Sequence, residues 1–413
     1  MKRHFLSCIL LCSITFPAAA QVKTVDTFCS SETGKPSLRH TYVVIDGAVA
    51  TEDTPEGPSP DNTAWRRFAA QFFDARNVAI DQMMSPRERI TIAIANSDGS
   101  GLTPLFTGCL PTVGKEEAAK LDQETTSMQT FFGSDWRSAN EKAAEEFSRT
   151  ATISLVQGMK NAKIGSPASR LDFAHGALIQ SLSRTKAYSL SDGLPRLIIY
   201  SNLSAYNLPV ADIATARAKG RSDADAITLD LQRVEVDLFS TGTAVSEEAA
   251  EYLKAFFLTA KGKVETIAGE GGAIGSNGVP IKVAVYQGGI SYGGDQYPVR
   301  MRLAQDVNGS VTMSWIEEQS DRLRFVPFGG ILNCTGGDNC TFVGDRVFAQ
   351  IWSDKPGATP TCEGWMPFGG LRELSFSTSG DQLTGKISDS ICVINGQEDG
   401  ISFTLQRVDN AVF

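Results

Sequence analysis

An acidic residue at the end of a strand-like run is the first place in this chain where chemistry could be built. The apolar run Tyr42 to Ile45 is followed directly by Asp46. A carboxylate fixed at a strand end can serve as a ligand for a hard cation such as Mg²⁺, which prefers oxygen donors. The residues at the next alternate positions are Ala48 and Ala50, whose side chains offer no lone pair. The run thus supplies one carboxylate and no second oxygen ligand.

Histidine and cysteine offer little further catalytic or metal-binding chemistry. A Ser-His-Asp or Cys-His system needs an imidazole, and beyond residue 20 the chain has only His40 and His175. His40 opens a strand and His175 lies in a helical stretch, so we interpret both as structural. No two cysteines have the Cys-x-x-Cys spacing of a zinc ribbon. We expect no metal, no cofactor and no catalytic residue, and we favour a protein without enzymatic activity while leaving an enzyme open.

The composition indicates a globular, exported protein. The chain has 413 residues, of which 42% are hydrophobic and 21% charged, and its net charge is -9. These values argue against a disordered polyelectrolyte and a nucleic-acid-binding protein, and the length predicts two or more domains. Residues 1–20 have the form of a signal peptide, with Lys2 and Arg3 before an apolar stretch and a run of alanines at its end. We expect a bacterial protein, periplasmic or secreted, without a transmembrane segment after cleavage.

Strand-like and helix-like runs alternate from residue 37 to residue 268, within a predicted first domain at 21–268. The predicted strands are His40–Asp46, Arg89–Asn96, Leu102–Leu110, Leu197–Tyr200, Val234–Phe239 and Val264–Ala268. The predicted helices are Asn62–Met83, Lys115–Glu124, Trp136–Lys160, Ser169–Arg184, Val210–Lys219 and Ser246–Lys261. The turn around Asp98 and Gly99 favours a hairpin over a calcium loop, so the third strand should be antiparallel. This order predicts an α/β fold with a doubly wound, mostly parallel sheet.

The same order, with its early hairpin, resembles a von Willebrand factor type A domain. In that family a metal-ion-dependent adhesion site uses Asp-x-Ser-x-Ser after the first strand, a threonine before a later helix, and an aspartate after the fourth strand. Asp46 matches the first aspartate, whereas Ala48 and Ala50 replace the serines and Asn202 stands where the last aspartate is expected. The helix entrance at 169–172 has no threonine. The resemblance therefore implies a degenerate site that holds no metal.

The loops after the parallel strands form the rim at which this architecture binds its ligands. The rim would combine residues 46–61 with residues 201–209. Our candidates for binding a protein partner there are Asp46, Asp98, Asn202 and Tyr206. The plainer alternative is that these loops are only solvated.

Beyond residue 20 the chain contains an even number of cysteines, which in an exported protein predicts disulfides. They are Cys29, Cys109, Cys334, Cys340, Cys362 and Cys392. The simplest pairing joins Cys334 to Cys340 and Cys362 to Cys392, although other pairings are possible. Cys29 then pairs with Cys109, which an antiparallel third strand would return to the same sheet edge as Cys29.

The pattern of predicted secondary structure changes after a glycine-rich segment at 269–280, which we interpret as a linker. Residues 281–413 carry short strand-like runs separated by turn residues and predict an antiparallel β domain, either a barrel or a sandwich. The predicted strands are Ile281–Tyr286, Tyr297–Ala304, Ser310–Glu317, Arg322–Pro327, Arg346–Ser353, Leu371–Ser377, Gln382–Ser388 and Ile401–Val408. The turn at 379–385 resembles the hairpins of lipocalin-like barrels.

Together these features favour an exported, non-catalytic binding or scaffolding protein that acts through protein contacts without a bound metal. Two alternatives stay open. The first is an extracytoplasmic hydrolase, and the second is a carrier that binds a small ligand or carbohydrate in the β domain.

Overall fold

The fold is described from a computed structural model of the chain. The residues whose structure is described are 23–25, 29, 39–47, 87–111, 113, 115–131, 135–161, 171–185, 194–209, 212–231, 234–240, 245–268, 280–292, 295–306, 310–319, 322–334, 339–344, 347–348, 350–353, 371–389 and 401–408. The predicted helix Asn62–Met83 and most of the predicted linker lie outside them.

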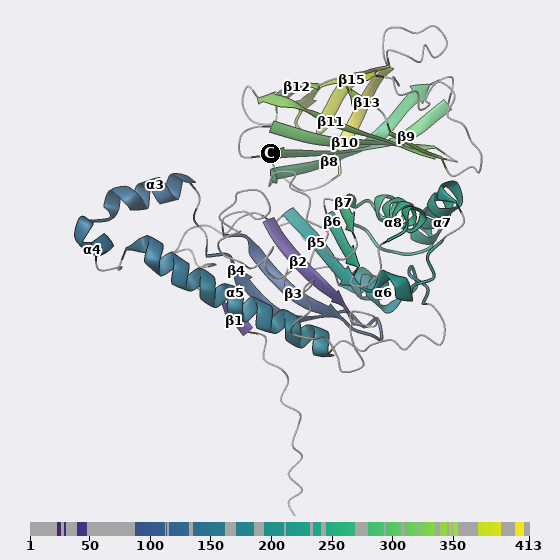
Figure 1. The fold of residues 1–413 in the computed structure, drawn as a ribbon. Coiled ribbons are helices and arrows are strands. Elements are labelled where there is room, and N and C mark those ends of the chain that lie inside the picture. Colours follow the sequence, from purple (N-terminus) through teal and green to yellow (C-terminus); the bar gives the residue numbers. More distant parts are fainter. Residues whose placement is uncertain are drawn as a thin grey trace, which may run out of the picture.

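The first part of the chain forms a mixed, mostly parallel sheet (Figure 1). Its strand order is β1 (Lys23–Val25), β4 (Leu102–Cys109), β3 (Arg89–Ala95), β2 (Arg39–Asp46), β5 (Leu194–Ser201), β6 (Glu235–Ser240) and β7 (Lys263–Ala268). The run from β3 through β2, β5 and β6 to β7 is parallel, whereas β4 is antiparallel to β3. The predicted hairpin is therefore confirmed. The edge strand β1, which pairs in parallel with β4, was not expected from the sequence.

Helices cover both faces of this sheet, because alternate side chains of each strand point to opposite sides. On one face Val44 belongs to a core that includes residues of α6 (Ala177–Arg184), α7 (Ile213–Asp225) and α8 (Glu247–Thr259). On the other face Val43 packs in a core with the inner side of α5 (Trp136–Asn161). With both faces buried, the middle parts of the central strands are apolar, as in Tyr42 to Ile45 of β2 and Leu197 to Tyr200 of β5.

The predicted helix Ser169–Arg184 is wrong in its first half. In the structure α6 begins only at Ala177, and the described residues before it form a bridge and turns. The amide of Leu171 donates to the carbonyl of Ala205, and the carbonyl of Leu171 accepts from the amide of Asn207. These bonds engage the backbone of Leu171 with the segment after β5 and not with a helix of its own.

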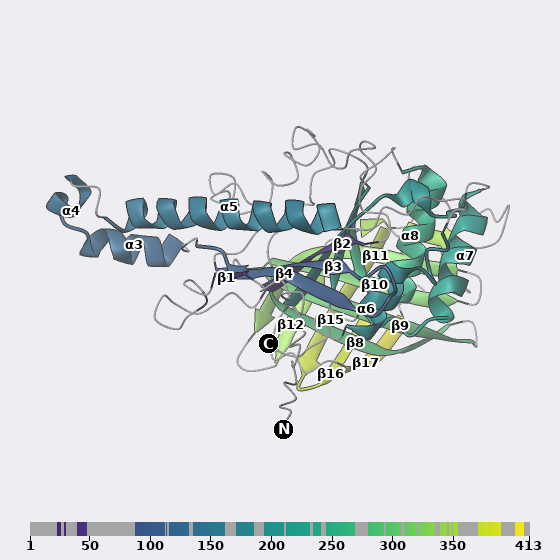
Figure 2. The same ribbon diagram turned by 90° about the horizontal axis from the view of Figure 1, so that it is seen from below.

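A helical arm extends away from the sheets. It consists of α3 (Lys115–Glu124), α4 (Ser127–Phe131) and the first part of α5, and both views show it projecting past the edge of the body (Figures 1 and 2). The base of the arm is fixed by an ion pair between Arg87 and Glu117. The indole of Trp136 donates to Asp122 at 2.9 Å and joins α5 to α3.

The second part of the chain forms a strongly curled antiparallel sheet. Its strands are β8 (Pro280–Tyr292), β9 (Asp295–Asp306), β10 (Ser310–Gln319), β11 (Arg322–Cys334), β12 (Cys340–Gly344), β13 (Val347–Phe348), β14 (Gln350–Ser353), β15 (Leu371–Ser379), β16 (Gln382–Asp389) and β17 (Ile401–Arg407). The order runs β10-β9-β8-β17-β16-β15-β12-β11-β14, and a further pairing joins β10 to β11. The sequence missed β12, and the single strand predicted at Arg346–Ser353 is wrong because β13 and β14 pair with different neighbours.

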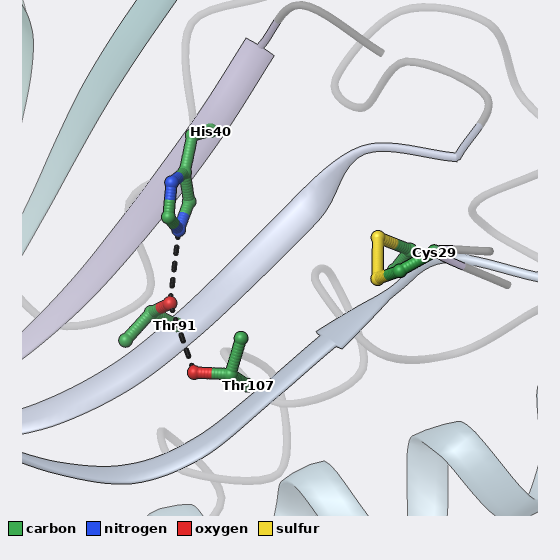
Figure 3. Close-up of a disulfide and its surroundings, with 5 residues drawn as sticks. Cys29, His40, Thr91 and Thr107 are labelled. Carbon is green, nitrogen blue, oxygen red and sulfur yellow. Dashed lines mark hydrogen bonds between the residues drawn. A yellow bond between two sulfur atoms is a disulfide. The ribbon is translucent and has the colours of Figure 1, made fainter. Parts of the chain in front are cut away.

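The structure contains a disulfide between Cys29 and Cys109, the pair that the strand layout predicts (Figure 3). The two Cα atoms lie 5.3 Å apart, and the bond closes a separation of 80 residues. A bridge of this kind contributes about 2–4 kcal/mol, mainly by restricting the unfolded chain. Cys340 is also disulfide-bonded and lies opposite Cys334 in the register of β11 and β12. The predicted pair of Cys362 and Cys392 lies outside the described residues.

Candidate functional site

The candidate site lies where the strand order of the first sheet reverses. The strands β2 and β5 are parallel neighbours, and the chain continues from β2 to one side of the sheet and from β5 to the other. Ligands of open α/β sheets bind at such a switch point, beyond the carboxyl ends of the strands. Asp46 is the last residue of β2, and Ser201 is the last residue of β5.

The carboxylate of Asp46 is buried and accepts hydrogen bonds from two hydroxyl groups. Asp46 is 0% exposed. Its Oδ2 accepts from the Oγ of Ser201 at 2.7 Å and from the hydroxyl of Tyr206 at 2.5 Å. Hydrogen bonds to an ionised acceptor are short and about twice as strong as neutral ones. The carboxylate is thus satisfied from within the protein.

Tyr206 is the buried residue that donates to Asp46 from the segment after β5. It follows a 3-10 turn (η4, Leu203–Ala205) directly after β5, and its ring packs edge-on against Phe173 with centroids 5.2 Å apart. Burial raises the pKa of Tyr206 well above its usual value, and the charge of Asp46 and the hydrogen bond to it act in the same direction. The phenol therefore keeps its proton and remains a donor to the carboxylate.

Gly47 makes the tight exit from β2 possible. A Cβ atom placed on Gly47 would lie 1.9 Å from the carbonyl oxygen of Ala95 on the neighbouring strand. Any side chain at position 47 would force the two backbones apart, since real Cβ atoms do not approach backbone oxygens so closely. The absence of a side chain at Gly47 therefore allows β2 to stay paired with β3 up to Asp46, which lies opposite Ala95.

The structure brings together some of the predicted rim residues. Asp46 and Tyr206 are in direct contact, and Asn202 is 5% exposed and lies next to Ser201 in the chain. Asp98 is exposed and accepts a hydrogen bond from the amide of Ser100 at 2.9 Å, in the β3–β4 turn. The contacts described for Asp98 are those of a hairpin turn. Of the predicted rim loop 46–61, all but Asp46 and Gly47 lies outside the described residues.

Sequence reasoning missed the role of Ser201. The signal was present, because Leu197, Ile199 and Ser201 occupy alternate positions of β5 and the first two lie in the same core as Val44. A polar residue that ends this alternation lies on the same side of the sheet as Asp46. The contact between Ser201 and Asp46 could be recognised only once β2 was known to pair with β5.

A second set of buried charges lies at the opposite end of the sheet, where the parallel strands begin. We call this end the amino edge. Arg39 at the start of β2 pairs with Glu235 at the start of β6. Arg196 of β5 donates to Glu88 at 3.3 Å and to Thr41 at 3.0 Å. All five residues are at most 5% exposed. These contacts tie together the starts of the parallel strands and the residue that precedes β3.

The second sheet reaches into this amino edge. Arg302 of β9 pairs with Oε1 of Glu235 at 3.1 Å, and Arg300 of β9 donates to the carbonyl of Leu258 near the end of α8. A guanidinium at the carboxyl end of a helix is favourable because the last carbonyls lack helical partners. Figure 1 accordingly shows the second sheet stacked against the amino ends of the first-sheet strands.

Glu235 is the acidic centre of this junction. Burial by itself would raise its pKa, but the charges of Arg39, Arg302, Lys263 and Arg196 together lower it to about 2. Glu235 is therefore ionised at neutral pH, and its charge is compensated by guanidinium groups from two strands of the first sheet and one of the second.

His40, also near the amino edge, is a packed side chain. Its Nε2 lies 2.9 Å from Oγ1 of Thr91, which in turn lies 3.1 Å from the hydroxyl of Thr107 (Figure 3). Its ring stacks on Tyr42 with centroids 4.0 Å apart. Burial, aided by the charge of Arg89, lowers the pKa of His40 to about 3. His40 is thus a neutral imidazole within a chain of hydroxyls.

Within the described part of the chain, no group of three or more His, Cys, Asp and Glu residues is arranged to hold a metal ion. None of the helices in that part is both long and apolar enough to span a bilayer. A scan against protein-family models and a search of curated proteins both find no match to this chain.

Proposed function

We propose that this protein is an exported, non-catalytic binding or scaffolding protein that works without a metal at its switch-point site. The observation that carries the proposal is the double hydrogen bond of Asp46 to Ser201 and Tyr206. Export agrees with the leader-like start of the sequence and with a disulfide, which persists in an oxidising compartment such as the periplasm.

A von Willebrand A-like fold is the finer interpretation of the first sheet. From β2 onward the order of the strands is third, second, first, fourth, fifth and sixth, and the third is antiparallel. Helices on both faces and a switch point between the first and fourth strands agree with this interpretation. It places Asp46 at the start of a metal-dependent adhesion site.

The environment of Asp46 supports a degenerate version of that site. A cation that used Oδ2 would have to displace the hydroxyl of Tyr206 and enter a place where Asp46 is 0% exposed. Mg²⁺ loses its waters reluctantly and requires several oxygen ligands. One carboxylate and one serine hydroxyl provide too few oxygen ligands to replace the water molecules that Mg²⁺ would lose.

The projecting arm supports a role in protein contacts. Met128 in α4 is 70% exposed, and α4 is held by a capping box in which Thr126 and Gln129 bond each other's backbone amides. Residues 125–131 carry no charge, although α3 and α5 on either side are rich in charged residues. An ordered, uncharged tip far from both cores is a surface that a partner protein could contact.

For the second sheet we favour a barrel over a sandwich. The further pairing of β10 with β11 connects the two halves of the strand order and supports closure. The hydrolase and carrier alternatives gain no specific support from the described residues.

Calorimetric titration of the full chain with Mg²⁺, Ca²⁺ and Mn²⁺ tests the metal-independent site. We expect no binding at micromolar concentrations by the wild type, by Asp46→Asn, or by the control Asp98→Asn, which changes an exposed aspartate in the turn. Micromolar binding that disappears in Asp46→Asn and persists in Asp98→Asn would overturn the proposal.

The non-catalytic part of the proposal needs a separate test. Cross-linking in the extracytoplasmic fraction of the native host should yield a specific protein adduct that is lost when Met128 is changed to Ser. Turnover in a screen of hydrolase substrates, abolished by substitution of an acidic residue, would instead favour the enzyme alternative.

A further inference from the structure

A small pocket lies at the junction of the two sheets. It is lined by Leu258, Lys261, Gly262, Lys263, Val285, Arg300 and Arg302, and its cavity volume is about 20 Å³. The first four of these residues belong to the end of α8, the following turn and β7, and the last three to β8 and β9. The pocket is thus built jointly by the α/β part and the β part of the chain.

The lining is strongly cationic. Four of its residues carry a positive charge and none carries a negative one. The chain as a whole has a net charge of -9, so this cluster is contrary to the average character of the protein. Cations are gathered here against their mutual repulsion, which an anion between them would relieve.

Part of this charge is already used by the junction. Arg302 pairs with Glu235 at 3.1 Å, and Arg300 donates to the carbonyl of Leu258. Lys261 lies 3.4 Å from Asp230, in a pair whose side chains are 37% and 54% exposed. An exposed pair of this length is weak, so Lys261 can turn to another anion at little cost.

One donor on the pocket wall has no acceptor among the described residues. The Nε of Arg302 is buried and makes no hydrogen bond there, and the side chain of Arg302 is 9% exposed. A buried donor left without an acceptor destabilises the folded protein, because it has lost its hydrogen bonds to water. Native proteins usually satisfy such groups, and Arg302 is one of the residues that line the pocket.

We propose that this pocket binds a small tetrahedral oxyanion of the phosphate or sulfate class, which bridges the two sheets. Arg302 offers its free Nε–H and Lys261 and Lys263 offer compact charges from β7 and the turn before it. Arginine suits oxyanions because its fixed donors match their geometry, and lysine serves as a mobile point charge. The bound ion would complete the junction that Arg302 and Glu235 begin.

Titration of the full chain with inorganic phosphate by calorimetry tests the proposal, with NaCl added to keep the ionic strength constant. The test variant is Lys261→Gln with Lys263→Gln, which leaves the pair of Arg302 and Glu235 in place. The matched control is Lys120→Gln with Lys386→Gln, which removes two exposed lysines of the arm and of β16. We expect the affinity for phosphate to fall at least about tenfold in the test variant and to stay unchanged in the control.

A second variant keeps the test decisive if the double variant is destabilised. Arg302→Lys retains a charge for Glu235 but removes the Nε donor, and it should also weaken phosphate binding by about tenfold. Sulfate should compete with phosphate, whereas chloride at equal ionic strength should not. Absence of phosphate binding, or binding of equal strength in wild type, test and control variants, would overturn the proposal. Neither outcome depends on Asp46, so the metal-independent site stands or falls separately.

Discussion

Two buried carboxylates at opposite edges of one sheet are satisfied in different ways. Asp46 at the carboxyl edge accepts from the neutral hydroxyls of Ser201 and Tyr206, whereas Glu235 at the amino edge pairs with Arg39 and Arg302. Hydroxyls supply hydrogen bonds without compensating the charge, while guanidinium groups supply both. The comparison shows that one edge is closed by local side chains and the other is used to join two parts of the chain.

This difference bears on where partners can bind. In open α/β sheets the carboxyl edge is the usual ligand site, but here the acid at that edge, Asp46, is buried and accepts a hydrogen bond from Tyr206. The amino edge is occupied in part by β9, through Arg300 and Arg302. Surfaces away from the strand ends, above all the arm with its exposed Met128, therefore become the stronger candidates for protein contacts.

The largest effect is expected from removing the charge at the amino edge. Glu235→Gln leaves the guanidinium groups of Arg39 and Arg302 facing a neutral amide in a buried place. Breaking one partner of a buried ion pair costs about 3–5 kcal/mol. Urea unfolding measures the loss, and Glu145→Gln, an exposed change on α5, is the control. A cost below that of Tyr206→Phe would contradict the contrast between the two edges.

A pH series sharpens the comparison, because His40 and Glu235 lie near the amino edge and both have lowered pKa values in the acid range. His40 has a pKa of about 3 in the folded protein and 6.5 when unfolded, so below pH 6.5 the unfolded state takes up the proton first. The contribution of His40 to the free energy of unfolding is therefore fully present above pH 6.5. It falls by about 1.4 kcal/mol per pH unit as the pH decreases toward 3. Glu235 adds to the loss only below its unfolded pKa of 4.5.

Between pH 6.5 and 4.5, of these two groups only His40 changes the free energy of unfolding. His40→Gln should flatten the fall of the unfolding free energy across this window, by about 2–3 kcal/mol in total. Thr130→Ala, which changes an exposed residue without a titratable group, is the control and should leave the slope unchanged. An unchanged slope in His40→Gln would show that His40 is not the group that titrates.

At the carboxyl edge a smaller loss is expected. Tyr206→Phe removes one hydroxyl from Asp46 and should cost about 2 kcal/mol, because a bond to a charged acceptor is lost in a buried place. Tyr252→Phe is a matched control, since Tyr252 also donates to an aspartate, Asp223, whose side chain is 17% exposed. We expect about 1 kcal/mol there. Equal costs in the two variants would mean that burial of Asp46 does not strengthen its bond.

The smallest effect is expected on the arm. Met128→Ser changes a side chain that is 70% exposed and should alter the free energy of unfolding by less than about 0.5 kcal/mol. Cross-linking to a partner should nevertheless be lost. A large loss of stability would show that Met128 supports the fold and is not a contact surface.

Local patterns in the sequence predicted much of the fold. The alternation of strands and helices, the turn at Asp98 and the pairing of Cys29 with Cys109 follow from residue types and spacing, because they depend on near neighbours or on strand direction. The strands β1 and β12 were missed because each is only three to five residues long. Short strands carry too few alternating residues to be recognised.

The sites were less predictable than the elements that carry them. Asp46 was recognised from its place at a strand end, but its partners Ser201 and Tyr206 are 155 and 160 residues away. The pair of Arg39 and Glu235 spans 196 residues, and its third member, Arg302, comes from the other sheet. Such contacts depend on strand order and register, which a single sequence does not specify.

Diffraction from crystals soaked in MnCl₂, recorded at the manganese absorption edge, tests the central claim most directly. The account predicts no anomalous peak at Asp46 and an unchanged hydrogen bond from Tyr206 to its carboxylate. An anomalous peak bound by Asp46, with the hydroxyl of Tyr206 displaced, would contradict the account and restore a metal-dependent site.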